Sequence, residues 1–202
     1  MRVIAGSAKG RTLTAPRGLA VRPTTDKVKG AIFSMLDADA FRRAAEDPEA
    51  SRPNRVLDLF AGTGALGIEA LSRGAEYCDF VESNPRARQA ITENLRRAGL
   101  TQRATVHALR AEAGLSTLPG PYDLILADPP YADSGLPALV TAIGQSGIIH
   151  ERTLVVIEHL RSAQLPTGSG QLQLLRSRYH GTTAITLYAS GASDVGEPPN
   201  SQ

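Results

Sequence analysis

The sequence has few aromatic residues and a single cysteine. Trp is absent and aromatic residues make up 4% of the 202 residues, so aliphatic side chains must fill the core. Cys78 stands alone, which excludes a disulfide framework, and the four histidines (107, 150, 159 and 180) lack metal-ligand spacing, so no metal site is predicted. No apolar run reaches the roughly 18–20 residues of a membrane span, and the amino terminus lacks the apolar stretch of a secretory signal. We therefore expect a cytoplasmic protein with no membrane partner.

Charge is distributed unevenly along the chain. The formal net charge is +2, but residues 1–30 hold seven Lys and Arg residues against Asp26, which gives this region +6 and leaves −4 for the remainder. A basic amino-terminal arm on a mildly acidic body is typical of proteins that bind a polyanion, and an ordinary charged surface is the alternative. The length suits one domain with a small appendage, and a hydrophobic share of 42% is enough for a core.

From residue 55 onwards, apolar segments of strand length alternate with segments of helical periodicity. This alternation predicts a parallel sheet with right-handed crossovers, closed by an antiparallel hairpin at residues 171–180 and 182–190. The fold class is a doubly wound, mostly parallel, seven-stranded α/β sheet of the Rossmann-like kind. The expected strands are 55–60, 76–82, 104–107, 122–127 and 152–159, and the expected helices are 65–74, 85–98, 109–118 and 134–147.

The amino-terminal region precedes this pattern. Apolar runs at residues 2–5 and 11–14 predict a small β-hairpin, and the following segment predicts a helix capped by Thr24, Thr25 or Asp26. We expect a basic hairpin-and-helix extension (1–43), a loop (44–54), a core (55–189) and a disordered tail (190–202).

A glycine-rich turn joins the first strand of the core to its first helix. The sequence "DLFAGTGALGIEA" places Gly62, Gly64 and Gly67 where the chain turns tightly and a ligand can approach the backbone. Glu82 ends the next strand about twenty residues after Gly62, where an acid would bind ribose hydroxyls. These features indicate a nucleoside-containing ligand without identifying it, and a purely structural glycine-rich turn is the alternative.

Asp58 lies in the first strand, four residues before Gly62. Its carboxylate would repel the pyrophosphate of NAD, whereas S-adenosylmethionine presents cationic ammonium and sulfonium groups that the carboxylate would attract. The sequence therefore favours S-adenosylmethionine. The alternative is that Asp58 accepts hydrogen bonds from backbone amides at the strand end.

The sequence "DPPY", residues 128–131, follows the fourth strand. Because parallel strands end at the same edge of a sheet, we expect this loop to face the glycine-rich turn. The Asp128 carboxylate and the Pro129 carbonyl can accept hydrogen bonds from the two N–H groups of an exocyclic amine on a nucleobase. Pro129 and Pro130 hold the backbone rigid, and Tyr131 can stack on the base plane. A stiff turn with a capping acid is the alternative.

These motifs, together with "GSAKGRTL" and "RPTTDKVKGAIFSML" near the amino terminus, resemble the bacterial 16S ribosomal-RNA guanine-N2 methyltransferase family of class I, S-adenosylmethionine-dependent enzymes. The resemblance covers roughly residues 2–188. It implies methylation at N2 of a guanine, of the guanine(966) type, in 16S rRNA of the small subunit or its precursor. It also implies that the amino-terminal hairpin helps to hold the RNA.

The resemblance, read with the residue chemistry above, assigns roles to three groups of residues. Catalytic roles fall to Asp128, Pro129, Pro130 and Tyr131. Cofactor binding falls to Asp58, Ala61, Gly62, Thr63, Gly64, Glu82, Ser83 and Asp128. Substrate binding falls to Arg2, Lys9, Arg11, Arg22, Thr24, Thr25 and Tyr131. Related enzymes often have an acid after the third strand, where this chain has Leu109 and Arg110, so the adenine contact stays open between backbone groups there and Glu112.

Two other functions are kept as alternatives. A DNA adenine-N6 methyltransferase shares "DPPY" but usually carries a target-reading insert, for which no gap here has room. A non-catalytic RNA-binding protein on the same fold would have degraded cofactor residues. With one active centre and no apolar stripe left over, we expect a monomer. Deletion of residues 1–20 is expected to abolish RNA methylation while leaving cofactor affinity intact.

Overall fold

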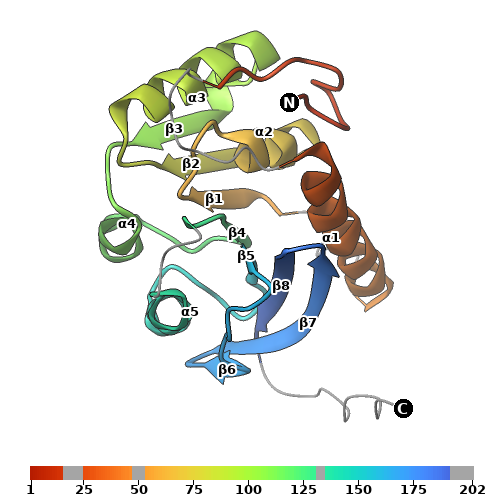
Figure 1. Ribbon diagram of the computed structural model, residues 1–202, viewed down its shortest axis with the longest axis vertical. Coiled ribbons are helices and arrows are strands. Elements are labelled where there is room, and N and C mark those ends of the chain that lie inside the picture. The colour runs from red at the N-terminus through yellow and green to blue at the C-terminus, as the bar shows by residue number, and fades with distance from the viewer. Residues whose placement is uncertain (16–24, 47–52, 131–134, 192–202) are drawn as a thin grey trace.

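The computed structural model describes residues 1–15, 25–46, 53–130 and 135–191, which form one twisted sheet with helices on both faces (Figure 1). Its strand order is β3-β2-β1-β4-β5-β8-β7-β6. This arrangement confirms the predicted fold class, with a two-residue strand, β6, in addition to the expected ones. The parallel strands are β1 (Arg55–Leu59), β2 (Tyr77–Val81), β3 (Ala104–His107), β4 (Leu124–Ala127) and β5 (Leu154–Leu160), and the antiparallel ones are β6 (Gly168–Ser169), β7 (Leu172–His180) and β8 (Thr183–Ser190).

Two apolar clusters, one on each face of the sheet, hold the helices in place. Side chains alternate between faces along each strand, so Val56 belongs to the cluster under α1, α2 and α3, and Leu57 to the cluster under α4 and α5. None of the helices in the described ranges is both long and apolar enough to cross a membrane. The helices are α1 (Asp26–Glu46), α2 (Ala65–Ser72), α3 (Pro85–Ala98), α4 (Ala111–Thr117) and α5 (Leu136–Gln145), with a 3-10 turn at Thr101–Arg103.

Local sequence signals set the ends of several helices. Asn84 caps α3 by accepting the N–H groups of Arg86 and Ala87, and Gly99 ends it with φ 72°. At the start of α1, the Thr25 hydroxyl accepts the N–H of Val28 at 3.2 Å. The helix α1 then runs to Glu46, so residues 44–46 are helical and do not belong to the predicted loop. The rest of that loop and most of the predicted tail lie outside the described residues.

The amino-terminal segment forms the predicted hairpin, reduced to a single bridge between Arg2 and Thr12, and it packs onto α2. The N–H groups of Ile4 and Ala5 donate to the Glu69 carboxylate at 2.8 and 3.0 Å. Lys29 Nζ lies 3.2 Å from the same carboxylate, and both side chains are fully buried. Lys29 is therefore an internal partner of Glu69 and adds nothing to the basic surface for which its charge was counted.

Candidate active site

The order of the strands reverses between β1 and β4, so their carboxyl ends flank a crevice of the kind that binds ligands in open α/β sheets. The glycine-rich turn lies there, after β1. It is tight, because the Gly64 N–H donates to the Ala61 carbonyl at 2.6 Å. Phe60, Gly62 and Gly64 have φ values of 57°, 55° and 78°. Gly62 and Gly64 adopt this left-handed conformation readily, whereas Phe60 is held there at a cost, and such strain concentrates at functional sites.

Gly67, the third glycine of the motif, lets α2 approach β2 closely. A Cβ atom at this position would lie 2.4 Å from Phe80 Cε1 and 2.7 Å from Cys78 Sγ, which no packed structure tolerates. Because α2 lies so close to the sheet, the Gly67 N–H donates to Asp58 Oδ2 at 2.8 Å. Gly67 therefore serves helix–strand packing, whereas the sequence alone predicts that the motif's glycines serve the tight turn and the approach of a ligand.

Asp58 is a buried carboxylate in acidic surroundings. Its side chain lies 1% exposed on β1. Burial, followed by the nearby charges of Asp128 and Glu82, raises the pKa of Asp58 well above its usual range, and the hydrogen bond from Gly67 only partly opposes this. The backbone bond considered from the sequence as an alternative is present. It does not remove the excess negative charge, which a cationic ligand would neutralise.

Glu82 follows β2 and ties two segments of the site together. Its Oε2 accepts the Gly62 N–H at 2.8 Å, and its Oε1 accepts the Asn84 N–H at 2.7 Å. Each carboxylate oxygen has two lone-pair sites, so each can accept a further bond from a ligand hydroxyl. This geometry fits the ribose-binding role expected for Glu82.

Two residues of α3 support this site, and the sequence patterns did not identify them. Asn94 is fully buried, and its amide donates to the carbonyls of Thr63 at 2.9 Å and Thr14 at 3.0 Å. Arg88 Nη1 donates to the carbonyls of Glu82 at 3.1 Å and Ser83 at 2.6 Å. Asn94 thus links the glycine-rich turn to the amino-terminal segment. The available signal was a polar residue on the otherwise apolar face of α3.

The predicted acceptor loop begins directly after β4. Leu126 lies opposite Asp58 in the register, and side chains alternate, so Asp128 comes next on the face that carries Asp58. Asp128 is half-buried, Pro129 is buried and Pro130 is exposed. One step beyond the last β4–β5 pair lies Glu158, which is 3% exposed on this face and was not singled out from the sequence. Tyr131 lies outside the described residues.

The predicted RNA-contacting residues occupy different environments. Arg2 is exposed and lies 3.7 Å from Asp26, and Lys9 and Arg11 are exposed as well. Thr25 is engaged as the cap of α1. Two further candidates, Arg22 and Thr24, lie outside the described residues.

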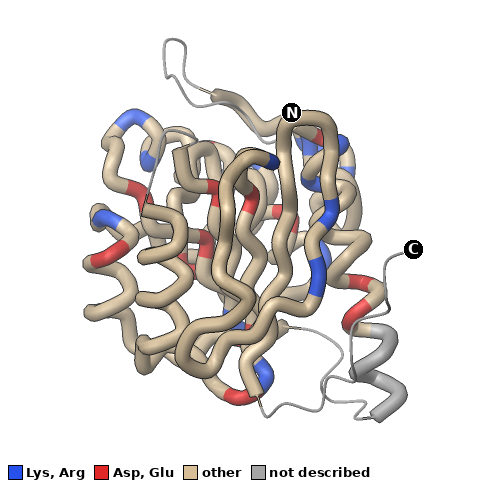
Figure 2. Tube along the Cα trace, turned by 60° about the horizontal axis from the view of Figure 1, so that its bottom comes forward, with Lys and Arg blue, Asp and Glu red and all other residues tan. Residues whose placement is uncertain are grey.

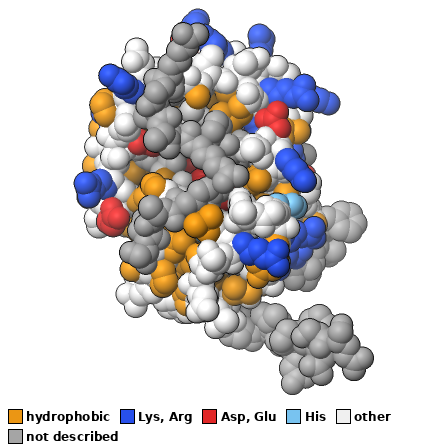
Figure 3. All heavy atoms as spheres, viewed as in Figure 1, with side chains coloured by type: hydrophobic (Ala, Val, Ile, Leu, Met, Phe, Trp, Pro, Cys, Tyr) orange, Lys and Arg blue, Asp and Glu red, His pale blue; other side chains and the backbone are white. Residues whose placement is uncertain are grey.

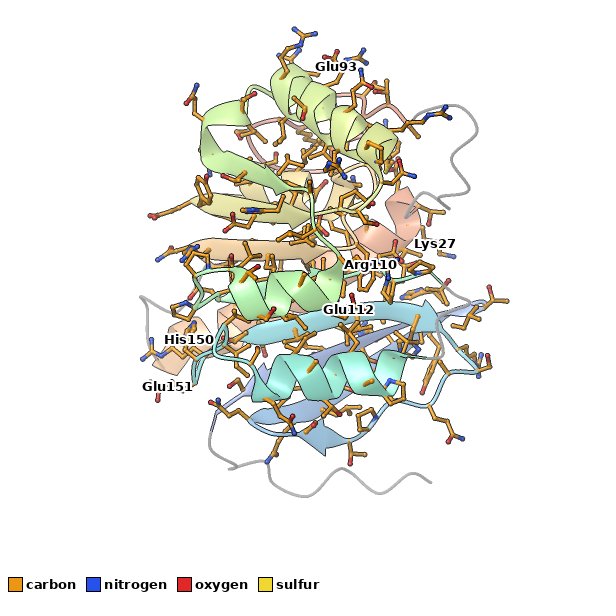
Figure 4. The ribbon with its side chains drawn as sticks, turned by 90° about the vertical axis from the view of Figure 1, so that its left-hand side faces the viewer. Lys27, Glu93, Arg110, Glu112, His150 and Glu151 are labelled. Carbon is orange, nitrogen blue, oxygen red and sulfur yellow. The ribbon has the colours of Figure 1, made fainter. Side chains whose placement is uncertain are left out.

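Figure 4 separates the two ends of the sheet: Lys27, Arg110 and Glu112 lie towards the end where the parallel strands finish, and His150 and Glu151 lie at the opposite end. Arg110 and Glu112 are exposed at the start of α4. Both candidates for the predicted adenine contact, this backbone and Glu112, therefore lie at the end of the sheet where the parallel strands finish.

Comparisons with known proteins agree with this geometry. The family model described as conserved hypothetical protein 95 matches residues 1–189. The chain is 41% identical to a putative rRNA methyltransferase of Bacillus subtilis over 93% of this chain and 98% of that protein. It is 31% identical to ribosomal RNA small subunit methyltransferase D of Escherichia coli over 96% of this chain and 94% of that protein.

Solved structures show the same architecture. A putative methyltransferase from Escherichia coli has a TM-score of 0.78 at 30% identity, with 96% of this chain and 99% of that chain covered. An RNA methyltransferase from Salinibacter ruber, in complex with S-adenosyl-L-homocysteine, has a TM-score of 0.60 at 16% identity over 89% of this chain and all of that chain, a likeness of fold alone. The matches support S-adenosylmethionine as the cofactor and confirm the resemblance drawn from the sequence: the chain belongs to the conserved hypothetical protein 95 family of S-adenosylmethionine-dependent rRNA methyltransferases.

Proposed function

We propose that this chain transfers a methyl group from S-adenosylmethionine to the exocyclic N2 of a guanine in 16S rRNA, of the guanine(966) type, during small-subunit assembly. The observation that carries the proposal is the group of carboxylates at the carboxyl end of the sheet, where Asp58 lies near Asp128 and Glu82 beside the glycine-rich turn. The names of the relatives, an rRNA methyltransferase and a small-subunit rRNA methyltransferase, support the substrate class.

The donor set fits S-adenosylmethionine, which supplies an electrophilic methyl group when bound. Asp58 attracts its cationic amino-acid end, because a buried carboxylate among like charges gains most from a nearby cation. Glu82 accepts hydrogen bonds from the ribose hydroxyls. The backbone from Ala61 to Gly64, held by Asn94 and Glu82, lines the pocket together with Ser83.

The acceptor loop holds the guanine amine. The Asp128 carboxylate and the Pro129 carbonyl each accept a hydrogen bond from one N–H of the amine, and this fixes the direction of the nitrogen lone pair. Pro130 restricts the loop, and Tyr131 stacks on the base. Much of the rate then comes from proximity and orientation. One N–H proton leaves after transfer, to water or to Asp128.

The RNA must present an unstacked guanine to this loop, at a cost of a few kcal/mol. Phosphate contacts offset that cost, and they come from the exposed Arg2, Lys9 and Arg11 and from Arg22. Thr24 and Thr25 lie next to the acceptor base. We infer that the enzyme acts as a monomer in the cytoplasm, where small subunits assemble. Among the described residues, Tyr179 is the one large hydrophobic side chain that is exposed, which supports a monomer.

The test is methyl transfer from tritiated S-adenosylmethionine to undermethylated small subunits, to naked 16S rRNA and to DNA in parallel. We expect label in the small subunits, recovered as N2-methylguanosine after digestion to nucleosides. Label in DNA as N6-methyladenine would establish the DNA methyltransferase instead. RNA binding without any transfer would establish the non-catalytic alternative.

A further inference from the structure

The hairpin of β7 and β8 ends beside the proposed active site. Thr183 at the start of β8 pairs with Leu160 at the end of β5, and β5 runs parallel to β4, which leads into Asp128. The Arg161 N–H donates to the Thr182 carbonyl at 2.9 Å, which fastens the turn to the end of β5. The tip of this hairpin (Arg161 with residues 178–182) therefore lies at the carboxyl end of the sheet, on the side of the acceptor loop away from the glycine-rich turn (Figure 1).

The hairpin tip carries an aromatic ring stacked with a cation. Tyr179 is 58% exposed, although large apolar rings are normally covered. The Arg161 guanidinium lies 5.0 Å from the centre of this ring. As a stabilising contact, an exposed cation–π pair contributes little. Stacked tyrosine and arginine side chains are, however, a common surface for unpaired nucleobases.

The hairpin and the end of β5 carry Arg161, Arg176 and Arg178, and the hairpin has no acidic residue. Residues 159–193 contain no Asp or Glu and form the longest acid-free stretch of the chain. Figure 2 shows the two strands of the hairpin with basic segments on β7 and at the end of β5, and with no acidic segment on β7 or β8. Figure 3 shows Lys and Arg side chains gathered beside a histidine over the same part of the molecule.

The strand register places the charge and the ring on different faces. Arg178 pairs with Ile185, which belongs to the face of Asp58 and α1, and Tyr179 pairs with Ala184 on the opposite face. Arg178 is exposed. Arg178 therefore lies on the same face of the sheet as Asp128, and Tyr179 lies on the other face at the tip of the hairpin.

We propose that the hairpin tip is a second RNA-binding surface, on which Tyr179 and Arg161 stack an unpaired nucleotide flanking the target and Arg178 contacts a phosphate. This inference rests on the proposed function, and it places an RNA contact at the end of the chain opposite to the basic arm. The target guanine is thereby held from both sides of the acceptor loop.

The main variant is Tyr179→Ala, compared with Tyr179→Phe, which keeps the ring. We expect Tyr179→Ala to raise KM for undermethylated small subunits about 10-fold, within the range for loss of one base–aromatic stack. Tyr179→Phe should stay within about twofold of the wild type. The kcat value, the Kd for S-adenosylmethionine and the thermal midpoint should not change. A KM for Tyr179→Ala within about twofold of the wild type, or equal losses for Ala and Phe, would overturn the proposal.

Salt dependence separates the charge from the ring. The measurement is the slope of log Kd against log salt concentration for a labelled single-stranded RNA. Arg178→Ala should lower this slope by the amount expected for the loss of about one phosphate contact. Tyr179→Ala should weaken binding without changing the slope. Arg96→Ala is the control, because Arg96 is another exposed arginine, at the carboxyl end of α3, and its substitution should leave both the affinity and the slope unchanged. If the wild type binds this RNA through the tip but methylates no small subunit, the proposed function fails and the RNA surface stands.

Discussion

Asp58 and Asp79 are buried aspartates on neighbouring strands, and their surroundings differ completely. Asp79, on the face of α4 and α5, is surrounded by complementary partners. Its carboxylate lies 3.3 Å from Arg55 Nη2, 2.7 Å from His107 Nε2 and 2.8 Å from the Tyr122 hydroxyl. Such a satisfied network contributes to the stability of the fold.

Asp58, on the opposite face, accepts one N–H, from Gly67, among the residues that the structure describes, and its charged neighbours there are acidic. A fold selected for stability alone would have no reason to gather Asp58, Glu82 and Asp128 at one point. The difference supports the proposal that Asp58 binds a ligand whereas Asp79 stabilises the fold, since strongly perturbed pKa values cluster at functional sites.

The largest expected effect is at Asp128, which stands on the functional side of this comparison. Asp128→Ala should lower kcat about 1000-fold, because it removes one of the two acceptors that orient the amine, while the thermal midpoint stays unchanged. The control is Asp123→Ala at the other end of β4, where the carboxylate accepts the N–H groups of Asn54 and Arg55 at 2.8 Å. That variant should lose stability and keep its turnover. Near-normal turnover of Asp128→Ala in single-turnover assays would refute the catalytic role.

Asp58→Asn should weaken binding of S-adenosylmethionine about 100-fold, because it removes a buried charge facing a cation and preserves the shape of the side chain. The free energy of unfolding of the protein without cofactor should stay equal or rise, since an uncompensated buried charge is lost. Calorimetric titration and urea unfolding measure the two quantities. A large loss of stability with intact affinity would reverse the comparison.

The matched substitution on the other strand is Asp79→Asn. It should reduce the free energy of unfolding by about 2 kcal/mol, because the bonds to Arg55, His107 and Tyr122 lose their charged acceptor. Affinity for S-adenosylmethionine should remain within about twofold, since the two carboxylates lie on opposite faces of the sheet. A drop in affinity as large as that of Asp58→Asn would show that the two residues belong to one site.

The elements of the fold were predictable where local chemistry decides them. Asn84, Pro85 and Gly99 define α3 without any knowledge of the sheet. The end of α1 was not predicted correctly. The polar, proline-containing stretch from residue 44 suggested a loop, but its first residues continue a run of Ala, Arg and Glu, which are good helix formers. The strand β6 is two residues long and exists only because β7 pairs with it.

The candidate site was predictable as far as sequence spacing reaches. Asp58 lies near the carboxyl end of β1, and Glu82 and Asp128 follow the adjacent strands β2 and β4, so parallel topology alone brings them together. Asn94 and Glu158 depend on how distant segments pack, which no local pattern encodes. For the same reason, sequence charge could not distinguish the buried Lys29 from the exposed Lys9.

The buried contacts of the amino-terminal segment also change the best test of its role. Deleting residues 1–20 would remove the N–H groups that Glu69 accepts and the Thr14 contacts of Asn94, next to the glycine-rich turn. Such a deletion would therefore perturb the cofactor site as well as any RNA contact. Substitutions at the exposed Lys9 and Arg11 leave this network intact.

The smallest expected effect concerns pH and depends on the raised pKa of Asp58, whose causes are burial first and then Asp128 and Glu82. In the unfolded chain this carboxyl ionises near its usual pKa of 3.8. Above that pH its ionisation disfavours the fold without cofactor, until pH exceeds the raised folded-state pKa and the penalty levels off. A bound cation has the opposite preference, because it attracts the ionised form. Affinity for S-adenosylmethionine should therefore rise several-fold as pH increases from 3.8 through the raised pKa of Asp58, as long as the ligand's amino group stays protonated. Calorimetric titrations across this range should show the rise in affinity in the wild type and no change in affinity with pH in Asp58→Asn. If the affinities of the two proteins changed with pH in the same way, the pH dependence would belong to another group. The electrostatic basis for contrasting Asp58 with Asp79 would then be lost.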